Sequence, residues 1–563
     1  MQPITLLATL TWSLVLSVLM IPGVLGAARP NVVLIITDDQ SPIIERAPGH
    51  NDPSAFSPYG SDVYTPNIER MATEGIRFDR ANVASTVCTA SRYNFLTGRY
   101  ASRSSAPHFL AFYPPGTMSR PDNMVELDPP DGPATLPQLL QASGYRTGFV
   151  GKSHVIHHHL FRNPSVTWKA AGLRTYARDA DPYDPVVGAA LAHNHALWRE
   201  WLRPYGFDFV DGVYPANLLE LFMDANNQHH LEWTVSKARD FLEGSRGSKQ
   251  PFFLYFATTI PHGPAPYRKQ PSPYPFGLGG PIFPFGLDGD IRVTPEGIIR
   301  EPFNFMPSRE EIRGSNAEAG FPEQLAYMTW LDAGVGAILQ KLDDIGAGSN
   351  TLVILTSDHG SWRRGKATLY EGGMRIPLIT RWPASQQAGR SFEGLVSNVD
   401  VAPTVLDLAG VDVAEGVVDG RSFRRVLEGS NLPFRDAVFA ELGWARAVKT
   451  ERWKYIALRY PDPVQRQIDE GIMFEYAKTV SRHRPYYTLN SSLGFHAAEH
   501  NPHYFAPDQL FDLRADPRET RNVITEHPEV AAQLQARLAD WLRMFPDRPF
   551  GEFSAIALPD APL

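Results

Sequence analysis

The sequence predicts an α/β fold, with a large domain whose central, mostly parallel sheet lies between helices, and a smaller C-terminal α+β domain with an antiparallel sheet. Continuous apolar runs at 31–37, 252–257 and 351–357 are typical of strands that are buried on both faces. The clearest amphipathic helix spans 322–344, between two of these runs. After a linker at 428–433, several strand-like segments indicate a second, smaller sheet.

The length and composition fit this division. A chain of 563 residues is too long for one compact domain, and we predict a large domain at 27–430 and a smaller one at 431–563. Apolar residues make up 43% and charged residues 20%, as in ordinary globular proteins. A formal net charge of −8 shows no basic excess, so we expect no nucleic-acid partner.

Residues 1–26 are predicted to be a signal peptide, because an apolar stretch at 6–25 precedes small residues suited to cleavage. We therefore expect export to a periplasmic, lumenal or extracellular location, with no stable membrane insertion after cleavage. An uncleaved membrane anchor is the alternative, since the apolar stretch is nearly long enough to span a bilayer. Cys88 is the only cysteine, so an intrachain disulfide is excluded.

The first strand, 31–37, ends in Asp38 and Asp39. The carboxyl end of a central parallel strand is where open α/β sheets bind ligands, and a hard divalent cation would relieve the repulsion between adjacent carboxylates. A solvated turn is the alternative. The segment at 64–75 starts with Thr65-Pro66 and closes on glycine, which predicts a scaffold helix.

Cys88 precedes a short helix that we expect at 93–96, so its side chain could lie at a helix N-terminus, where backbone N–H groups favour an anion. Arg92 adds a planar cation beside it. The alternative is a small core residue.

Another helix at 136–144 and a strand at 145–150 lead to Lys152 and His154, which can project to the same side. Taken alone, they would be a surface pair. The histidines at 157–159 could bind a metal, but a solvated loop is the simpler interpretation. We expect substrate-side loops over 160–230 and a helix at 228–242.

His262 follows the strand 252–257 between prolines, and alone it would be a structural histidine. Residues 264–308 lack periodicity and predict a long loop over the site that influences substrate choice. The strand 351–357 ends at Asp358 and His359, and Lys366 follows. A helix at 400–410 completes the large domain. Beyond the linker we expect strands at 437–442, 447–449 and 453–458, a strand and turn at 509–523, and a helix at 529–544.

Four motifs together resemble those of the sulfatase family. They are Cys88-Thr89-Ala90-Ser91-Arg92 followed by Leu96-Thr97-Gly98-Arg99, Gly151-Lys152-Ser153-His154, Pro261-His262, and Lys366-Ala367-Thr368-Leu369-Tyr370-Glu371-Gly372-Gly373. The resemblance spans 31–377. Ala90 stands where most members have proline, and His359 where many have asparagine.

The resemblance implies a chemistry. A formylglycine-generating enzyme would oxidise Cys88 to formylglycine, whose hydrated aldehyde is the nucleophile on a sulfated small molecule or saccharide. One calcium ion would be held by Asp38, Asp39, Cys88, Asp358 and His359. The cations of Arg92, Lys152 and Lys366 would stabilise the transition state. His262 and Lys366 would assist the leaving oxygen, and His154 would act as a base.

Two other functions remain open. One is a phosphatase or phosphonate monoester hydrolase of the same superfold. It is disfavoured by Arg92 and by the pairing of Lys152 with His154. The other is a non-catalytic carbohydrate-binding relative, which is disfavoured because every polar position expected in the site is filled.

Overall fold

A computed structural model describes residues 29–42, 63–161, 164–263, 276–281, 291–300, 303–361, 365–470, 501–554 and 556. The predicted signal peptide lies outside these residues, as do 264–275, 282–290 and 301–302 of the predicted loop. Within the described ranges, no helix combines the length and apolar character needed to cross a bilayer.

The large sheet has eight strands in the order β12-β2-β11-β10-β1-β5-β3-β4. Strand β11 is antiparallel to both of its neighbours, and every other pairing is parallel, as the sequence predicted. The strands are β1 (Asn31–Thr37), β2 (Ile76–Asn82), β3 (Arg146–Lys152), β4 (Phe209–Tyr214), β5 (Phe252–Ala257), β10 (Thr351–Ser357), β11 (Leu378–Arg381) and β12 (Arg390–Ser397).

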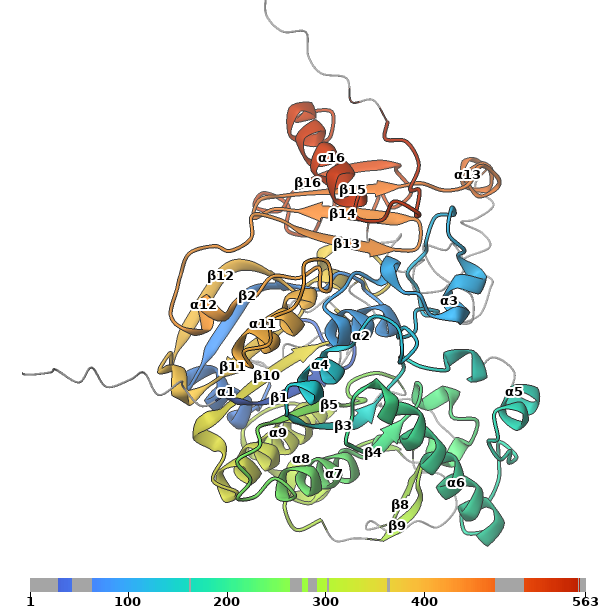
Figure 1. Ribbon diagram of the computed structural model, residues 1–563, viewed down its shortest axis with the longest axis vertical. Coiled ribbons are helices and arrows are strands. Elements are labelled where there is room, and N and C mark those ends of the chain that lie inside the picture. The colour runs from blue at the N-terminus through green and yellow to red at the C-terminus, as the bar shows by residue number, and fades with distance from the viewer. Residues whose placement is uncertain are drawn as a thin grey trace, which may run out of the picture.

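Helices cover both faces of this sheet (Figure 1). In β1, Val32 and Leu34 face one apolar core and Val33 and Ile35 face the other, as a strand with helices on both sides requires. The core that Val32 and Leu34 face is covered by α2 (Cys88–Thr97), α4 (Leu136–Ala142), α6 (Pro185–Leu202) and α11 (Val401–Leu408). The core that Val33 and Ile35 face is covered by α1 (Pro66–Thr73), α7 (Leu231–Glu243), α8 (Arg309–Glu318) and α9 (Ala326–Asp344).

The prediction of loops over 160–230 is wrong. This region contains α5 (Pro164–Ala170), the 18-residue helix α6, and β4. The buried face of α6 includes Asn194 and His195 among its apolar residues, so polar side chains interrupt the apolar pattern that would have identified the helix. Within 264–308, the described residues 276–281 and 291–300 form two short hairpins, β6 (Phe276–Gly277) with β7 (Gly280–Pro281) and β8 (Ile291–Thr294) with β9 (Gly297–Arg300).

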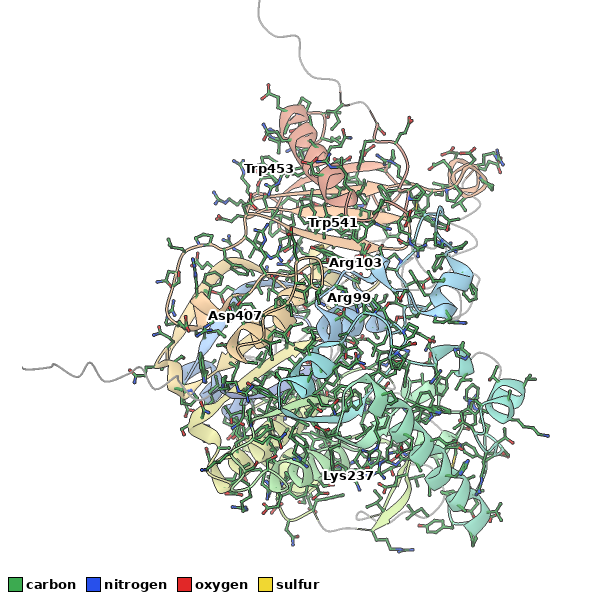
Figure 2. All side chains as sticks on the ribbon, in the orientation of Figure 1. Arg99, Arg103, Lys237, Asp407, Trp453 and Trp541 are labelled. Atoms are coloured by element: carbon green, nitrogen blue, oxygen red, sulfur yellow. The ribbon has the colours of Figure 1, made fainter. Side chains whose placement is uncertain are left out.

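The C-terminal region forms a separate antiparallel sheet in the order β13-β14-β15-β16. Its strands are β13 (Val438–Leu442), β14 (Ala445–Lys449), β15 (Trp453–Leu458) and β16 (Asp508–Asp512), with α16 (Pro528–Leu542) packed on them. Trp541 of α16 is labelled in Figure 2. Its ring packs on that of Tyr100 of the large domain, with ring centroids 4.9 Å apart. Four further short α-helices are α3 (Pro107–Phe112), α10 (Glu371–Met374), α12 (Arg424–Leu427) and α13 (Asp462–Asp469). The domain boundary at 430 remains a prediction.

Candidate active site

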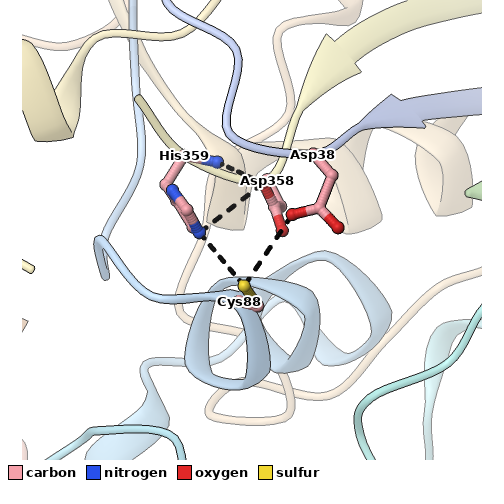
Figure 3. Close-up of side chains that lie close together, drawn as sticks. All are labelled: Asp38, Cys88, Asp358 and His359. Carbon is pink, nitrogen blue, oxygen red and sulfur yellow. Dashed lines mark hydrogen bonds and ion pairs between the residues drawn. The ribbon is translucent and has the colours of Figure 1, made fainter. Parts of the chain in front are cut away.

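The polar residues that follow three strands meet at one edge of the sheet. β1 and β10 are parallel neighbours, so Asp38 and Asp358 emerge side by side. Lys152 ends β3. Cys88 starts α2 opposite Asp38 and Asp358 (Figure 3). All four side chains are buried. The strand ends and the helix start that the sequence singled out therefore form one cluster.

Helix α2 begins at Cys88, five residues earlier than the predicted start at 93. Its N-cap residue, Val87, makes no side-chain cap, so local sequence gives no start signal. Contacts to the sheet hold the first turn instead: the Ser91 hydroxyl donates to the Asp358 carbonyl, and Arg92 Nη2 donates to Asp358 Oδ2 at 3.0 Å. The Cys88 thiol thus lies in the first turn of a helix that is buried along its whole length.

The Cys88 thiol is surrounded by charged groups, which excludes the interpretation as an ordinary core residue. Sγ lies 3.3 Å from His359 Nε2 and 3.8 Å from Asp38 Oδ1 (Figure 3). It also lies 3.6 Å from Lys366 Nζ. Burial would raise the pKa of the thiol, but the charges of Lys152, Lys366 and His359 hold it well below its usual value. The surroundings of residue 88 therefore favour an anion.

Two of the carboxylates each have a lysine partner. Lys152 Nζ donates to Asp38 Oδ2 at 2.5 Å, and Lys366 Nζ donates to Asp39 Oδ1 at 2.7 Å. Burial alone would raise the pKa of Asp38, but the charge of Lys152 outweighs it and lowers the pKa below the usual range. Asp38 is thus held as a carboxylate next to the thiol.

The third carboxylate, Asp358, is repelled by the negative charge of Asp38. Burial and the nearby charge of Asp38 raise the pKa of Asp358 to about 7. Burial opposes a charge on His359, but the Asp358 carboxylate raises the pKa of this imidazole to about 9. His359 Nε2 also lies 3.3 Å from Asp39 Oδ1. Positive charge at this point therefore stabilises the three acids together.

The donor set fits a hard divalent cation. One group of ligand atoms within 4.8 Å of one another comes from Asp38, Cys88, Asp358 and His359, and a second, sharing two of these residues, adds Asp39 and His262. Carboxylate oxygens are the ligands that Ca²⁺ prefers, and the buried side chains of Asp38, Asp39 and Asp358 supply them to these two groups. All five predicted metal ligands lie in these groups.

Lys366 reaches the cluster because two chain segments approach closely behind it. A Cβ atom at Gly360 would lie 1.9 Å from the carbonyl oxygen of Gly372, so only glycine fits there. The Gly360 N–H donates to the Gly373 carbonyl at 2.9 Å. The Gly-Gly pair of the fourth motif therefore holds the turn that carries Lys366 against the end of β10.

Two histidines border the cluster. His154 is fully buried, and neither of its ring nitrogens makes a hydrogen bond to a described residue. Burial lowers its pKa to about 4, so the imidazole is neutral at pH 7. His262 is partly exposed, with Nε2 3.9 Å from Asp39 Oδ2. Asp39 and His154 also adopt positive φ angles, 64° and 52°, a backbone conformation that is more common at functional sites.

Sequence reasoning missed two residues beside the cluster. Asn217 Oδ1 accepts a hydrogen bond from Lys152 Nζ at 2.6 Å, and Glu220 Oε2 lies 3.8 Å from His154 Nε2. They form a capping box around one short turn after β4. The only signal in the sequence was that both residues follow β4. This strand was hard to recognise because it contains Asp211 and Gly212, residue types that are uncommon in strands.

Two family models match the chain. The model described as Sulfatase matches residues 30–411, and that described as N-sulphoglucosamine sulphohydrolase, C-terminal, matches residues 358–466. The first match alone covers more than half of the chain and includes every predicted site residue.

Individual relatives agree. Rat steryl-sulfatase is 27% identical, covering 91% of this chain and 89% of its own. The N-acetylglucosamine-6-O-sulfatase of Bacteroides thetaiotaomicron is 25% identical, covering 92% and 87%. A solved protein in complex with its substrate D-glucosamine-2-N,6-O-disulfate shares the fold, with a TM-score of 0.52, 20% identity and coverage of 92% of this chain and 98% of its own. The chain belongs to the sulfatase family and is a sulfuric ester hydrolase.

Proposed function

We propose that this enzyme hydrolyses sulfate esters of a carbohydrate, with a formylglycine made from Cys88 and one bound calcium ion. The observation that carries the proposal is the position of Cys88, whose thiol lies within 3.8 Å of a carboxylate, an imidazole and an ammonium group in a buried cluster. The carbohydrate assignment is supported by a relative that acts on N-acetylglucosamine 6-O-sulfate, as its name states.

Calcium would be held by Asp38, Asp39, Asp358, His359 and residue 88, which are the donors grouped above. When bound, the ion supplies Lewis-acid polarisation of a sulfate oxygen and lowers the pKa of a hydroxyl that it contacts. Its charge would also take over the role that Lys152 and Lys366 have here as partners of the two carboxylates. Those ammonium groups would then be available to the substrate.

Formylglycine would supply the nucleophile as the hydrated aldehyde of residue 88. Cys88 is 1% exposed, so a formylglycine-generating enzyme has access to it only before this region folds. We therefore propose such an enzyme as a partner during synthesis and export, which the segment at 1–26 would direct. Ala90, two residues after Cys88, is compatible with recognition by such an enzyme, because its side chain is only a methyl group.

The chain's own cations would bind the sulfuryl group. Arg92, Lys152 and Lys366 come from α2, β3 and the turn after β10, so they approach the position of residue 88 from three sides. They are buried, so their charges act in a low-dielectric site without reorganisation during the reaction. They would orient the sulfate and stabilise the negative charge that develops on its oxygens.

The two histidines would move protons. His154 is neutral at pH 7 because of its burial, and its unprotonated ring nitrogen can accept a proton from a hydroxyl on residue 88. His262 lies beside Asp39, whose charge raises the pKa of the imidazole although burial opposes this. A protonated His262 can donate to the oxygen of the departing alcohol, and it is the more exposed of the two.

The alternatives make different predictions. A phosphatase or phosphonate monoester hydrolase would need its cations to fit a more highly charged group, and a carbohydrate-binding relative would need no nucleophile. The assay is release of the phenol from a chromogenic aryl sulfate and from the matching aryl phosphate, with and without a calcium chelator. We expect turnover of the sulfate that the chelator abolishes and calcium restores, and little turnover of the phosphate.

The matched variant is Cys88→Ala, which removes the proposed nucleophile and leaves the carboxylates in place. We expect a loss of about 10⁴-fold or more in kcat, as when a covalent nucleophile is removed from other hydrolases. A normal circular dichroism spectrum and melting curve would show that the variant folds. Wild-type activity in the folded variant would overturn the proposal.

A further inference from the structure

A second group of metal-type donors lies outside the sulfatase site. It comprises His108 on α3, Glu126 in the segment after α3, and His159 in the short 3-10 helix His158–Phe161. One ligand atom from each residue lies within 4.8 Å of the other two. None of the three has a role in the chemistry proposed above. The histidine run at 157–159 is therefore not the solvated loop that the sequence suggested.

We propose that His108, Glu126 and His159 bind a divalent transition-metal ion that prefers imidazole ligands, with Zn²⁺ as the representative. Tetrahedral zinc with bonds of about 2.0–2.1 Å sets its ligand atoms about 3.3–3.4 Å apart. His159 Nδ1 and Glu126 Oε1 are separated by 3.4 Å. Two histidines and one glutamate form a familiar three-residue zinc set that leaves a fourth position for water.

Glu126 is held as a carboxylate ligand should be. Its side chain is buried, and Oε1 accepts a hydrogen bond from the backbone N–H of His158 at 2.7 Å. Burial would raise its pKa, but the hydrogen bond from His159 and the nearby imidazoles lower it. The carboxylate is therefore ionised at pH 7 and already directed at the histidine ring that would share the metal.

The two imidazoles are close together and reachable from solvent. The rings of His108 and His159 have centroids 4.7 Å apart and an interplanar angle of 38°. Both side chains are partly exposed, so an ion can enter without unfolding the segment. His157 packs on Trp201 at 4.9 Å and lies 5.8 Å from His159, which limits the directions that the His159 ring can take. The donors are thus restrained before any ion arrives.

The backbone around the group is cross-linked to the core. The Leu127 N–H donates to the Val155 carbonyl at 2.8 Å, and the Ser104 hydroxyl donates to the Glu126 carbonyl at 2.8 Å. A metal here would join α3 to the segment that begins at His154, whose ring lies 4.7 Å from that of His158. The ion would therefore brace the segment that carries the proposed base, and its first effect would be on stability.

The test uses the full enzyme, freed of other metals and saturated with calcium so that the carboxylates of the sulfatase site are occupied. Zinc is added and the bound metal is counted after gel filtration, and the melting temperature is recorded with and without zinc. We expect one zinc per chain and a higher melting temperature. His159→Ala and Glu126→Gln should lose this zinc and the stabilisation, whereas His193→Ala, at a partly exposed histidine elsewhere, should keep both.

Anomalous diffraction at the zinc edge locates the ion in wild-type crystals and does not depend on the variants folding. A peak between His108, Glu126 and His159 supports the proposal. Zinc found only among the carboxylates near Cys88, no retained zinc, or equal zinc binding in folded His159→Ala would overturn it. Because the readouts are metal content, melting temperature and position, the result is independent of whether the enzyme cleaves sulfate esters.

Discussion

Two buried charge clusters of similar composition lie at opposite ends of one motif. Lys366 enters the active site, where it contacts Asp39. Five residues later, Glu371 lies between the two sheets in what we call the inter-sheet cluster, which consists of Glu371, Lys449, Lys454 and Glu519. The same short segment therefore supplies one cluster with a cation and the other with an anion.

The clusters differ in how their charges are paired. Glu371 lies 2.8 Å from Lys449 and 2.7 Å from Lys454, and Lys454 lies 2.7 Å from Glu519. Lys449 Nζ also donates to Asn82 Oδ1 at 2.8 Å. In this cluster each charge has an opposite charge in contact, and Glu519 has a positive φ of 56°, as Asp39 and His154 do in the active site.

The active site adds groups that the inter-sheet cluster lacks. The Cys88 thiol and the His359 and His262 imidazoles lie beside its carboxylates, and burial and the nearby charge of Asp38 raise the pKa of Asp358 to about 7. Buried polar atoms without a hydrogen-bond partner and positive φ angles occur in both clusters, so they do not distinguish them. The comparison teaches that burial and charge alone do not identify a catalytic site. The thiol and the imidazoles beside the carboxylates do.

The largest difference in kcat between variants of the two clusters should come from replacing one lysine in each by methionine. Lys366→Met removes a proposed transition-state cation and should lower kcat by about 10²–10³-fold with the protein still folded. Lys449→Met removes a cation of the same type from the inter-sheet cluster and should leave kcat per folded molecule unchanged. Kinetics with a chromogenic aryl sulfate, corrected for the folded fraction, measure both.

If Lys449→Met lowered kcat as strongly as Lys366→Met, the division between a catalytic and a structural cluster would fail. Equal loss of stability in the two variants, with no difference in kcat, would contradict it in the same way.

Glu371→Gln should separate stability from activity. The variant leaves the buried ammonium groups of Lys449 and Lys454 without the carboxylate between them, and breaking a buried ion pair costs about 3 kcal/mol of folding free energy or more. We expect a lower melting temperature and a normal kcat below that temperature. Calorimetry and steady-state kinetics on the same preparation test this, and an unchanged melting temperature would show that the cluster contributes no stability.

The smallest effect is a pH dependence at Glu519. Burial raises the pKa of this carboxyl to about 6, so the folded protein holds its proton more tightly than the unfolded chain does. The resulting stabilisation is present at low pH and is lost as the pH rises through about 6. Relative to Glu519→Gln, the wild type should lose on the order of 1–2 kcal/mol between pH 4.5 and pH 7. Urea unfolding of both proteins at these pH values measures the difference, and a constant or growing advantage of the wild type would contradict the assignment.

Much of this arrangement was predictable from the sequence, for a physical reason. Apolar runs such as 31–37 and 351–357 cannot be solvated, so they become central strands, and parallel strands deliver Asp38 and Asp358 to one edge. The start of α2 at Cys88 was not predictable, because Val87 provides no cap and contacts to Asp358 hold the first turn. Asn217 and Glu220 were missed for a related reason. Their link to Lys152 and His154 exists only after β3 and β4 pair.

The central claim is that the anion-favouring environment of residue 88 serves a formylglycine and not a thiol. Mass spectrometry of the peptide containing residue 88, from enzyme made in a host with a formylglycine-generating enzyme, tests it most directly. We predict an aldehyde at position 88, in a fraction that rises and falls with specific activity across preparations. A fully active preparation that carries only the unmodified cysteine would contradict the account.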